Sequence, residues 1–507
     1  MVRLLARKAE DSFETLIEDV KVNERNAPKY TIEGREVNIW DERHAFYHSR
    51  FPSDYVKEKI LECEKDNVDP FPDIVGKAEE KELVKNALLS SSPILFKGRK
   101  GYGKTTFSKS IAKLLPERML AVRGCKINDD PTNPSCFSCK KKILEDKAVD
   151  LTWVSRIWVR VPGDPMLTSR QLVGGISIQK IREGFDLDHP EVFIPGRALK
   201  ANRGVGYFDE LGAIPSSLQT LLHELFEEHQ VTTVEGDLVP FKINTVEVAS
   251  TNPANYRGTS PIKEPLLDRM EEIEVRPPKS LEEEIEIGRR NMHVVKRFNQ
   301  DPAIPRWHME ILARAVRYAR DKEGCAIAKE IESEPSCRAT IKSYDHIKSR
   351  ALRSGRNVPL LADYGASYEI VKLAFLGRIE VGYEAGDSKN KIVDRLVEEA
   401  VKRTCRSIYE KIPKEDFEEF YNSAAKVAED LDGDRYLPIN GAAVGKLRAE
   451  DKVNLVIRNI LGEGEADDEL YLSAFEIALH SIAVCAPAYV SRKGSGYVLH
   501  GLAGNEA

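Results

Sequence analysis

The sequence predicts an α/β fold in which a parallel sheet flanked by helices is followed by a mostly helical region. From about residue 69 to residue 278, short β-rich runs alternate with helical patterns, the order that builds a parallel sheet with helices on its faces. The Pro277-Pro278 pair closes this part of the chain. Beyond it, apolar residues recur at helical spacing, as in the stripe Phe417, Phe420, Tyr421, Ala424, Ala428 and Leu431.

The expected strands are short and spread through residues 69–278. They are Pro93–Phe96, Ile157–Val161, Val205–Asp209, Thr245–Thr251 and Ile273–Val275. Between them lie amphipathic segments, one of which carries Leu218, Leu221, Leu222 and Leu225 on a single helix face. We therefore expect four parts: an amino-terminal extension of unknown role (1–68), an α/β domain (69–278), a helical domain (279–385) and a helical carboxy-terminal domain (386–507).

Composition and charge exclude several classes of protein. The 507 residues are 31% charged and 41% hydrophobic, which is typical of a soluble globular chain of several domains. The net charge of -6 argues against a globally basic nucleic-acid-binding surface and leaves a local basic pore open. No apolar stretch approaches the ~20 residues that span a bilayer. The amino terminus lacks a secretory signal, and eight cysteines are too few for a disulfide scaffold. We expect a cytoplasmic protein.

A candidate phosphate-binding loop follows the first expected strand. Gly98 to Thr105 reads G-x-x-x-x-G-K-T, between an apolar strand and the helical pattern Phe107–Leu115, a context that argues against an incidental glycine-rich turn. Lys104 would reach the β- and γ-phosphates, and the Thr105 hydroxyl would ligate Mg²⁺. ATP and Mg²⁺ are the expected cofactors, and the expected nucleotide contacts are Gly98, Gly101, Gly103, Lys104, Thr105 and Thr106.

An acidic pair ends a later strand. Hydrolysis needs one carboxylate in the magnesium shell and a second that orients or deprotonates water. Asp209 suits the first role and Glu210 the second. Taken alone, acidic residues after a strand are equally explained as caps of the next helix. Their position about 100 residues beyond the phosphate loop favours the catalytic interpretation.

Two further polar residues lie near the end of the α/β domain. Asn252 follows the strand Thr245–Ser250, where an amide could hold the attacking water or contact the γ-phosphate, or could simply begin a turn. Arg269 could reach the nucleotide of a neighbouring subunit and stabilise charge in the transition state. Its alternative is a surface ion pair with Asp268.

These motifs, in this order, resemble those of AAA+ ATPases, and more narrowly the ATPase (I) subunit of magnesium chelatase and its MoxR-type relatives with a helix-2 insert. The resemblance covers roughly residues 69–350. Besides the motifs above, it rests on FPDIVG at 71–76, GCKINDDPTNPSCFSC at 124–139, LVGGISIQKIREG at 172–184 and FIPGRALKANRGVGYFDEL at 193–211.

The resemblance implies a P-loop AAA+ core, a helical lid at 279–385, ATP hydrolysis, and a homo-oligomeric ring, expected to be hexameric, that acts on an unidentified protein partner. It places Asn252 as the first sensor, Arg269 as the arginine finger and Arg338 as the second sensor, in the lid. Lys263 stands where a further arginine is expected. The D-x-S-x-S metal site of chelatase partner subunits is absent from the sequence.

Three functions stay open on these residues. The leading one is a ring-forming ATPase that remodels a protein partner. The second is a metal-chelatase motor that drives Mg or Co insertion into a tetrapyrrole, and the third is a DNA-stimulated, helicase-like motor. Glu210 weakens a fourth interpretation, a non-hydrolysing scaffold. Fold-level analogy does not choose between these functions.

Three cysteines form a separate pattern. Cys125, Cys136 and Cys139 have the spacing C-x10-C-x2-C in a loop rich in Pro and Asp. Such thiolates can share one Zn²⁺, but a structural zinc site normally has four ligands, and no fourth Cys or His is nearby. We expect packed free thiols, with a redox-sensitive pair as an alternative and zinc as the less favoured one.

Overall fold

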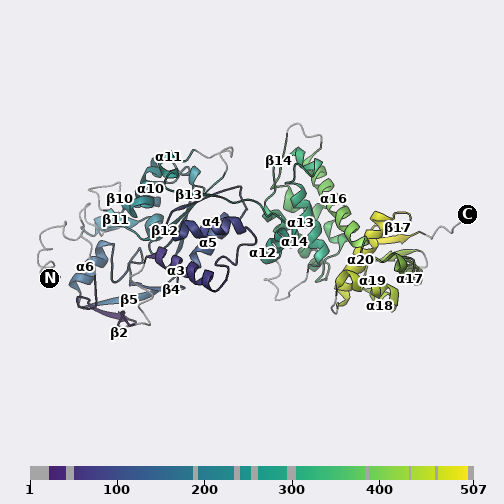
Figure 1. Cartoon of the computed structure of the whole chain (residues 1–507), viewed down its shortest axis with the longest axis horizontal. Helices are drawn as coiled ribbons and strands as arrows, with labels where there is room; N and C mark the ends of the chain where they lie inside the picture. The colour runs from purple at the N-terminus through teal and green to yellow at the C-terminus, as the bar shows by residue number, and fades with distance from the viewer. Residues whose placement is uncertain are drawn as a thin grey trace, which may run out of the picture. The chain divides into compact units, whose positions relative to one another are not determined.

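The computed structural model describes residues 22–41, 51–185, 192–232, 240–252, 261–293, 304–382, 387–432, 435–462 and 466–500. Residues 1–21 and 42–50 of the predicted amino-terminal extension lie outside this range. The chain divides into two compact units, Met1–Arg276 and Pro277–Ala507 (Figure 1). Among the described residues, no helix is long and apolar enough to cross a membrane.

A five-stranded parallel sheet forms the centre of the first unit. Its strands lie in the order β13 (Glu271–Glu274), β3 (Ile94–Lys97), β12 (Thr245–Thr251), β9 (Gly204–Asp209) and β6 (Trp158–Pro162). Every neighbouring pair is parallel. All residues of β9 and β12 are buried, because helices cover both faces of such a sheet. The predicted α/β fold, a parallel sheet with helices on its faces, is confirmed.

Alternate residues of these strands face two helical layers. One layer contains α3 (Pro52–Lys65), α4 (Ala78–Leu89) and α5 (Lys104–Ala112), and it packs on a set of strand residues that includes Phe96, Tyr207 and Val248. The other layer contains α10 (Ser216–Glu228) and packs on the adjacent positions Leu95, Phe208 and Ala249. The carboxyl ends of β3, β9 and β12 therefore lie at one edge of a sheet that is packed by helices on both faces.

The amino-terminal extension contributes to a second sheet. Its order is β2 (Arg35–Val37), β1 (Lys29–Ile32), β5 (Ala148–Ser155) and β4 (Arg118–Val122). β1 pairs in parallel with β5, and α6 (Phe137–Glu145) packs against this sheet through Cys139 and Ile143. Residues 22–41 are thus an integral part of the first unit, a role that the sequence did not reveal.

Short elements complete the first unit. The segment 172–184, which resembles the helix-2 insert, contributes β7 and α8. The short elements are α7 (Ser169–Leu172), β7 (Gly174–Ile176), α8 (Ile178–Arg182), β8 (Phe193–Pro195), α9 (Arg197–Lys200), η3 (Leu211–Ala213), β10 (Gln230–Thr232), β11 (Pro240–Lys242) and α11 (Glu264–Leu267).

The second unit is mostly helical, as predicted. Its helices are α12 (Leu281–Asn291), α13 (Arg306–Tyr318), η5 (Ala326–Glu330), α14 (Cys337–Arg353), η6 (Leu361–Tyr364), α15 (Glu369–Phe375), α16 (Lys389–Tyr409), α17 (Lys414–Asp432), α18 (Gly441–Arg448), α19 (Asp451–Leu461) and α20 (Asp468–Cys485). Its strands, in two small sheets, are β14 (Ile331–Ser333) and β15 (Glu380–Val381), and β16 (Tyr436–Pro438), β17 (Val490–Lys493) and β18 (Gly496–Leu499).

One hydrophobic cluster runs through this unit from Ile304 to Leu499. The apolar stripe predicted on α17 faces it, with Phe420 and Tyr421 buried. α20 lies within the cluster, and most of its residues are buried. The cluster contains residues on both sides of residue 385, and the domain boundary expected there stays a prediction.

A buried ion pair links three segments of the second unit. Glu284 on α12 has no exposed side-chain surface. Its carboxylate accepts hydrogen bonds from Arg320 Nη1 at 2.7 Å and from the hydroxyl of Thr340 on α14. A carboxylate buried this deeply is tolerated only with such partners.

Replacing the cation of this pair should destabilise the protein. We expect Arg320→Met to lower the free energy of unfolding by about 3–5 kcal/mol, because Glu284 would keep a buried charge without its counter-ion. Arg289→Met, which removes an exposed pair with Glu286, should cost less than about 1 kcal/mol. Urea unfolding followed by circular dichroism compares the two. Equal losses would contradict this account of the buried pair.

Candidate nucleotide-binding site

The phosphate loop connects β3 to α5 at the carboxyl edge of the sheet. Gly101 and Gly103 have φ angles of +82° and +103°, which favour glycine. Gly98 is needed for another reason, since a Cβ atom there would lie 2.5 Å from the carbonyl oxygen of Val275. Gly103 caps α5, so the unpaired N–H groups of the first helical turn face the loop and can bind an anion.

Lys104 is the buried cation of this loop. Its Nζ donates hydrogen bonds to the carbonyl oxygens of Gly98 and Arg99, the latter at 3.2 Å, and to Asn252 Oδ1 at 3.1 Å. Asn252 directly follows β12, and β12 is the strand that pairs with β3. The ammonium group is therefore held at the loop next to the amide that was predicted to contact the same phosphate.

Asp209 and Thr105 are connected through Tyr207. The Thr105 hydroxyl lies 3.1 Å from Tyr207 Oη, which donates to Asp209 Oδ1 at 2.9 Å. Ser250 Oγ donates to the same oxygen at 2.7 Å, and Arg160 Nε donates to Oδ2 at 2.9 Å. A hydroxyl and a carboxylate are the oxygen ligands that Mg²⁺ prefers. Here the two groups share one hydrogen-bond partner, so the residues present fit this ion.

The surroundings of Asp209 keep its carboxylate ionised. Burial alone would raise the pKa of Asp209, but the hydrogen bonds from Ser250, Tyr207 and Arg160, together with the Arg160 charge, hold it below its ordinary value. A carboxylate that stays charged is the form that ligates a divalent cation.

Glu210 follows in a left-handed backbone conformation, with φ of +55°. For a residue other than glycine this conformation costs on the order of 1–2 kcal/mol, and such strain is concentrated at functional positions. The side chain is partly exposed and pairs with Lys100 Nζ of the phosphate loop at 3.1 Å. A Cβ atom at Gly163 would lie 2.1 Å from the Glu210 carbonyl oxygen, so the segment after β6 packs directly on this acid.

Three predicted residues have different surroundings. Arg269 Nε donates to Glu227 Oε2 at 2.7 Å, so its partner is Glu227 rather than the Asp268 weighed as an alternative. Thr106 is exposed on α5. Arg338 is exposed at the start of α14 in the second unit, and its role as second sensor stays a prediction.

Sequence reasoning missed four residues of this site: Lys100, Arg160, Tyr207 and Ser250. Three of them are polar groups within apolar strands, and this is the signal that could have found them. Tyr207 and Ser250 lie in fully buried strands, where a polar side chain needs a hydrogen-bond partner, whereas Arg160 is half exposed on β6. Asp209 is a partner of all three. The lysine carried no comparable signal, because charged residues are common in surface loops.

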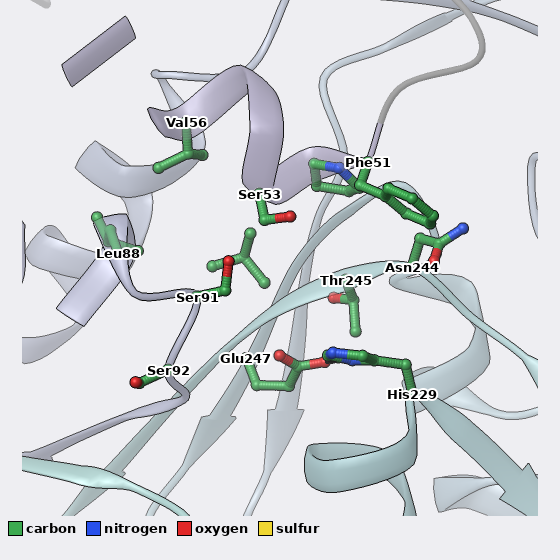
Figure 2. Close-up of a pocket in the computed structure, with 12 residues that line it drawn as sticks. Phe51, Ser53, Val56, Leu88, Ser91, Ser92, His229, Asn244, Thr245 and Glu247 are labelled. Atoms are coloured by element: carbon green, nitrogen blue, oxygen red, sulfur yellow. Dashed lines mark hydrogen bonds and ion pairs between the residues drawn. The ribbon is translucent and has the colours of Figure 1, made fainter. Parts of the chain in front are cut away.

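A separate pocket of about 220 Å³ lies at the opposite edge of the sheet. Figure 2 shows Phe51 and Leu88 on its walls, with His229 and Glu247 side by side. His229 Nδ1 lies 3.2 Å from Glu247 Oε1. Thr245, which also lines the pocket, begins β12, whose other end lies at the phosphate loop. Ligands of parallel α/β sheets bind beyond the carboxyl ends of the strands, so this pocket is not the nucleotide site.

Known proteins are similar to part of this chain. The chain is 29% identical over 231 residues to the magnesium-chelatase 38 kDa subunit of Acidiphilium rubrum, which covers 44% of this chain and 62% of that protein. It is 28% identical over 239 residues to the magnesium-chelatase subunit ChlI homologue of Methanocaldococcus jannaschii, which covers 46% and 60%. The chain resembles ChlI-type subunits of magnesium chelatase. The resemblance predicted from the motifs is confirmed.

The similarity to ChlI-type subunits is partial. The chain spans about three fifths of the length of these two relatives, and no protein-family model matches it. Among solved structures, the complex of magnesium-chelatase subunits BchI and BchD aligns with 65% of this chain at 21% identity, with a TM-score of 0.34. At that score the alignment carries no weight for function.

Removing the loop cation should abolish nucleotide binding. We expect Lys104→Ala to lose measurable affinity for a non-hydrolysable ATP analogue, because the phosphates would lose their principal side-chain cation. Lys113→Ala, which removes an exposed lysine paired with Asp73, should bind as the unaltered protein does. Isothermal titration calorimetry measures both. Undiminished affinity in Lys104→Ala would refute the assignment of the phosphate loop.

Proposed function

We propose that the protein is a ring-forming ATPase of the AAA+ type that couples ATP hydrolysis to remodelling of a protein partner. One observation carries the ATPase part of this proposal. Side chains from the loop after β3, from the end of β9 and from the end of β12 meet at one edge of the sheet, and they supply a phosphate-binding cation, two Mg²⁺ ligands, an acid and an amide: Lys104, Thr105, Asp209, Glu210 and Asn252.

Each of these groups has a distinct task in hydrolysis. Lys104 and the backbone N–H groups at the start of α5 bind the β- and γ-phosphates. Thr105 and Asp209 would hold Mg²⁺, which would neutralise charge that develops on the phosphates. Asn252, beside Lys104, orients the γ-phosphate or the attacking water. Glu210 accepts a proton from that water. The water oxygen bonds to the γ-phosphorus, and the bond between the γ-phosphorus and the oxygen of the β-phosphate breaks.

Arg269 supports the ring. Within its own chain the guanidinium is held by Glu227 and by the Pro265 carbonyl, and its side chain keeps 29% exposure. Among the contacts of the described residues, none joins it to the phosphate loop. An arginine placed in this way can contact the nucleotide bound by a neighbouring subunit. Such a contact joins different faces of two subunits, and head-to-tail contacts of this kind form a ring when the rotation between subunits closes on itself. The resemblance to AAA+ proteins supports a homo-oligomer, and six subunits is the number we propose.

A second candidate function is a metal-chelatase motor. The similarity to subunits named for magnesium chelatase favours it. In that case the tetrapyrrole and the metal to be inserted would be held by other subunits, because this sequence lacks the D-x-S-x-S motif. A nucleic-acid motor is less favoured because the net charge is -6.

The acid Glu210 should be needed for hydrolysis and not for binding. We expect Glu210→Gln to bind ATP normally and to lose nearly all turnover, because only activation of the water is removed. Glu272→Gln, which changes an exposed carboxylate paired with Lys97, should keep full turnover. A phosphate-release assay measures both. Normal turnover in Glu210→Gln would mean that another carboxylate activates the water.

The hydrolysis-deficient variant also tests the partner. Glu210→Gln loaded with ATP should retain a protein partner in an affinity pull-down, and Lys104→Ala should not, because it cannot reach the ATP-bound state. Proteins retained equally by both variants would not support ATP-dependent remodelling. Retention of tetrapyrrole-binding subunits would favour the chelatase motor.

Arg269 should act in trans. We expect Arg269→Ala to bind ATP and to lose most turnover, since such arginines contribute on the order of 10³–10⁵ in rate. Mixing it with Lys104→Ala should restore part of the activity, because a Lys104→Ala subunit can offer its Arg269 to an intact phosphate loop. A mixture of Lys104→Ala and Glu210→Gln should stay inactive, because each site needs its own Lys104 and Glu210.

Assembly should appear in the concentration dependence of the unaltered protein. Turnover per chain should rise with protein concentration as rings form. Constant turnover over a broad dilution series, together with no recovery in the Arg269→Ala mixture, would show that the protein hydrolyses ATP as a monomer.

A further inference from the structure

Four potential metal ligands converge in the first unit, away from the phosphate loop. Cys125 and Asp129 lie in the loop after β4, Cys136 caps α6, and Cys139 lies in the first turn of α6. One ligand atom from each lies within 4.8 Å of the others. The sequence offered no fourth cysteine or histidine nearby, and the fold supplies a carboxylate instead. This fourth donor removes the reason for preferring free thiols.

The spacing of the donors suits a single small ion. Cys125 Sγ and Cys136 Sγ are 3.7 Å apart. Zinc–sulfur bonds of about 2.3 Å in a tetrahedron place two sulfurs about 3.8 Å apart. A disulfide would bring them to about 2.05 Å. An iron–sulfur cluster inserts iron and sulfide atoms between its cysteines and spreads them farther.

Asp129 is the observation that points most directly to a cation. Its side chain is 1% exposed. Oδ2 accepts hydrogen bonds from the backbone N–H groups of Ser135 at 2.8 Å and Cys136 at 2.7 Å. Oδ1 is buried and has no hydrogen-bond partner among the described residues. A buried acceptor left unpaired is unfavourable, and a metal ion among the three cysteines would satisfy it.

The loop is held in place from two sides before any ion binds. Tyr30 Oη, on β1, donates to the Pro131 carbonyl at 2.7 Å. Asn202 Nδ2, two residues before β9, donates to the Ile127 carbonyl at 3.1 Å. The amino terminus of α6, which Cys136 caps, adds positive potential on this side of the loop. Preorganised donors of this kind lower the cost of collecting the ligands around a metal.

We propose that Cys125, Asp129, Cys136 and Cys139 bind one structural Zn²⁺ that fixes the loop between β4 and α6. Asp129 and Cys139 are 1% and 2% exposed, and Cys125 and Cys136 are partly exposed. Four protein ligands would leave no position for a substrate. The loop that the ion would fix is the one that Tyr30 on β1 and Asn202 before β9 contact. The site is independent of ATP hydrolysis, so either proposal can fail alone.

Metal content tests the site directly. Full-length protein purified with reductant and without chelators should contain about one zinc per chain by elemental analysis. Cys63→Ser, a change on α3 outside the cluster, should keep it, and the double change of Cys136 and Cys139 to Ser should lose it. Zinc-free protein from cells grown with added zinc would overturn the proposal. So would zinc retained in the double variant, iron with sulfide, or a Cys125–Cys136 disulfide as the native state.

Asp129→Asn isolates the fourth ligand. An amide oxygen can still accept the N–H groups of Ser135 and Cys136, but the variant has no carboxylate to bind the ion. We expect zinc to pass to a chromogenic chelator at least roughly tenfold faster than from the unaltered protein. Protein loaded with Co²⁺ in place of zinc should show charge-transfer bands from the thiolates and the strong visible absorption of a tetrahedral site. Both spectral features should change in Asp129→Asn. Unchanged release and spectra would remove Asp129 from the site, and the proposed ligand set would fall.

Discussion

The buried carboxylate of Asp209 is the constraint on which the rest of the candidate site depends. Its hydrogen bonds come from three neighbouring strands, through Arg160 on β6, Tyr207 on β9 and Ser250 on β12. Tyr207 extends the network to Thr105 on α5. A shift of one residue in the register of β6 or β12 against β9 would turn Arg160 or Ser250 to the other face. Their hydrogen bonds to Asp209 therefore form only in the observed register, and Tyr207 connects this network to the helix after the phosphate loop.

The residues that sequence reasoning found belong to motifs that are local along the chain. Lys104 and Thr105 are fixed by the spacing of one loop, and Asp209 and Glu210 by the end of one strand. Arg160 and Ser250 became visible only in the sheet, because their partner is set by pairing across strands that lie far apart in sequence. Local spacing can be read from a sequence, whereas register cannot be read without knowing which strands are neighbours.

The same distinction explains the other differences. The five strands and the helical second unit follow from hydrophobic periodicity. The pairing of β1 with β5 joins Thr31 to Asp150. Hydrophobic periodicity cannot predict a contact between residues so far apart in the sequence. Asp129 was overlooked because aspartate is common in loops. Its significance comes from a buried oxygen without a partner, which is a property of the folded loop alone.

The parallel pairing of β1 with β5 also bears on how the protein tolerates shortening. The part of the sequence that resembles AAA+ ATPases in its motifs begins at about residue 69. A version that starts there would lack β1 and β2 and would leave β5 as an open edge, with a row of unpaired N–H and C=O groups. Exposed edges of this kind recruit strands from other molecules. In the whole protein β1 covers this edge of β5, and the sheet ends instead at β2, a strand of three residues, which is too short to offer a long row of unpaired groups.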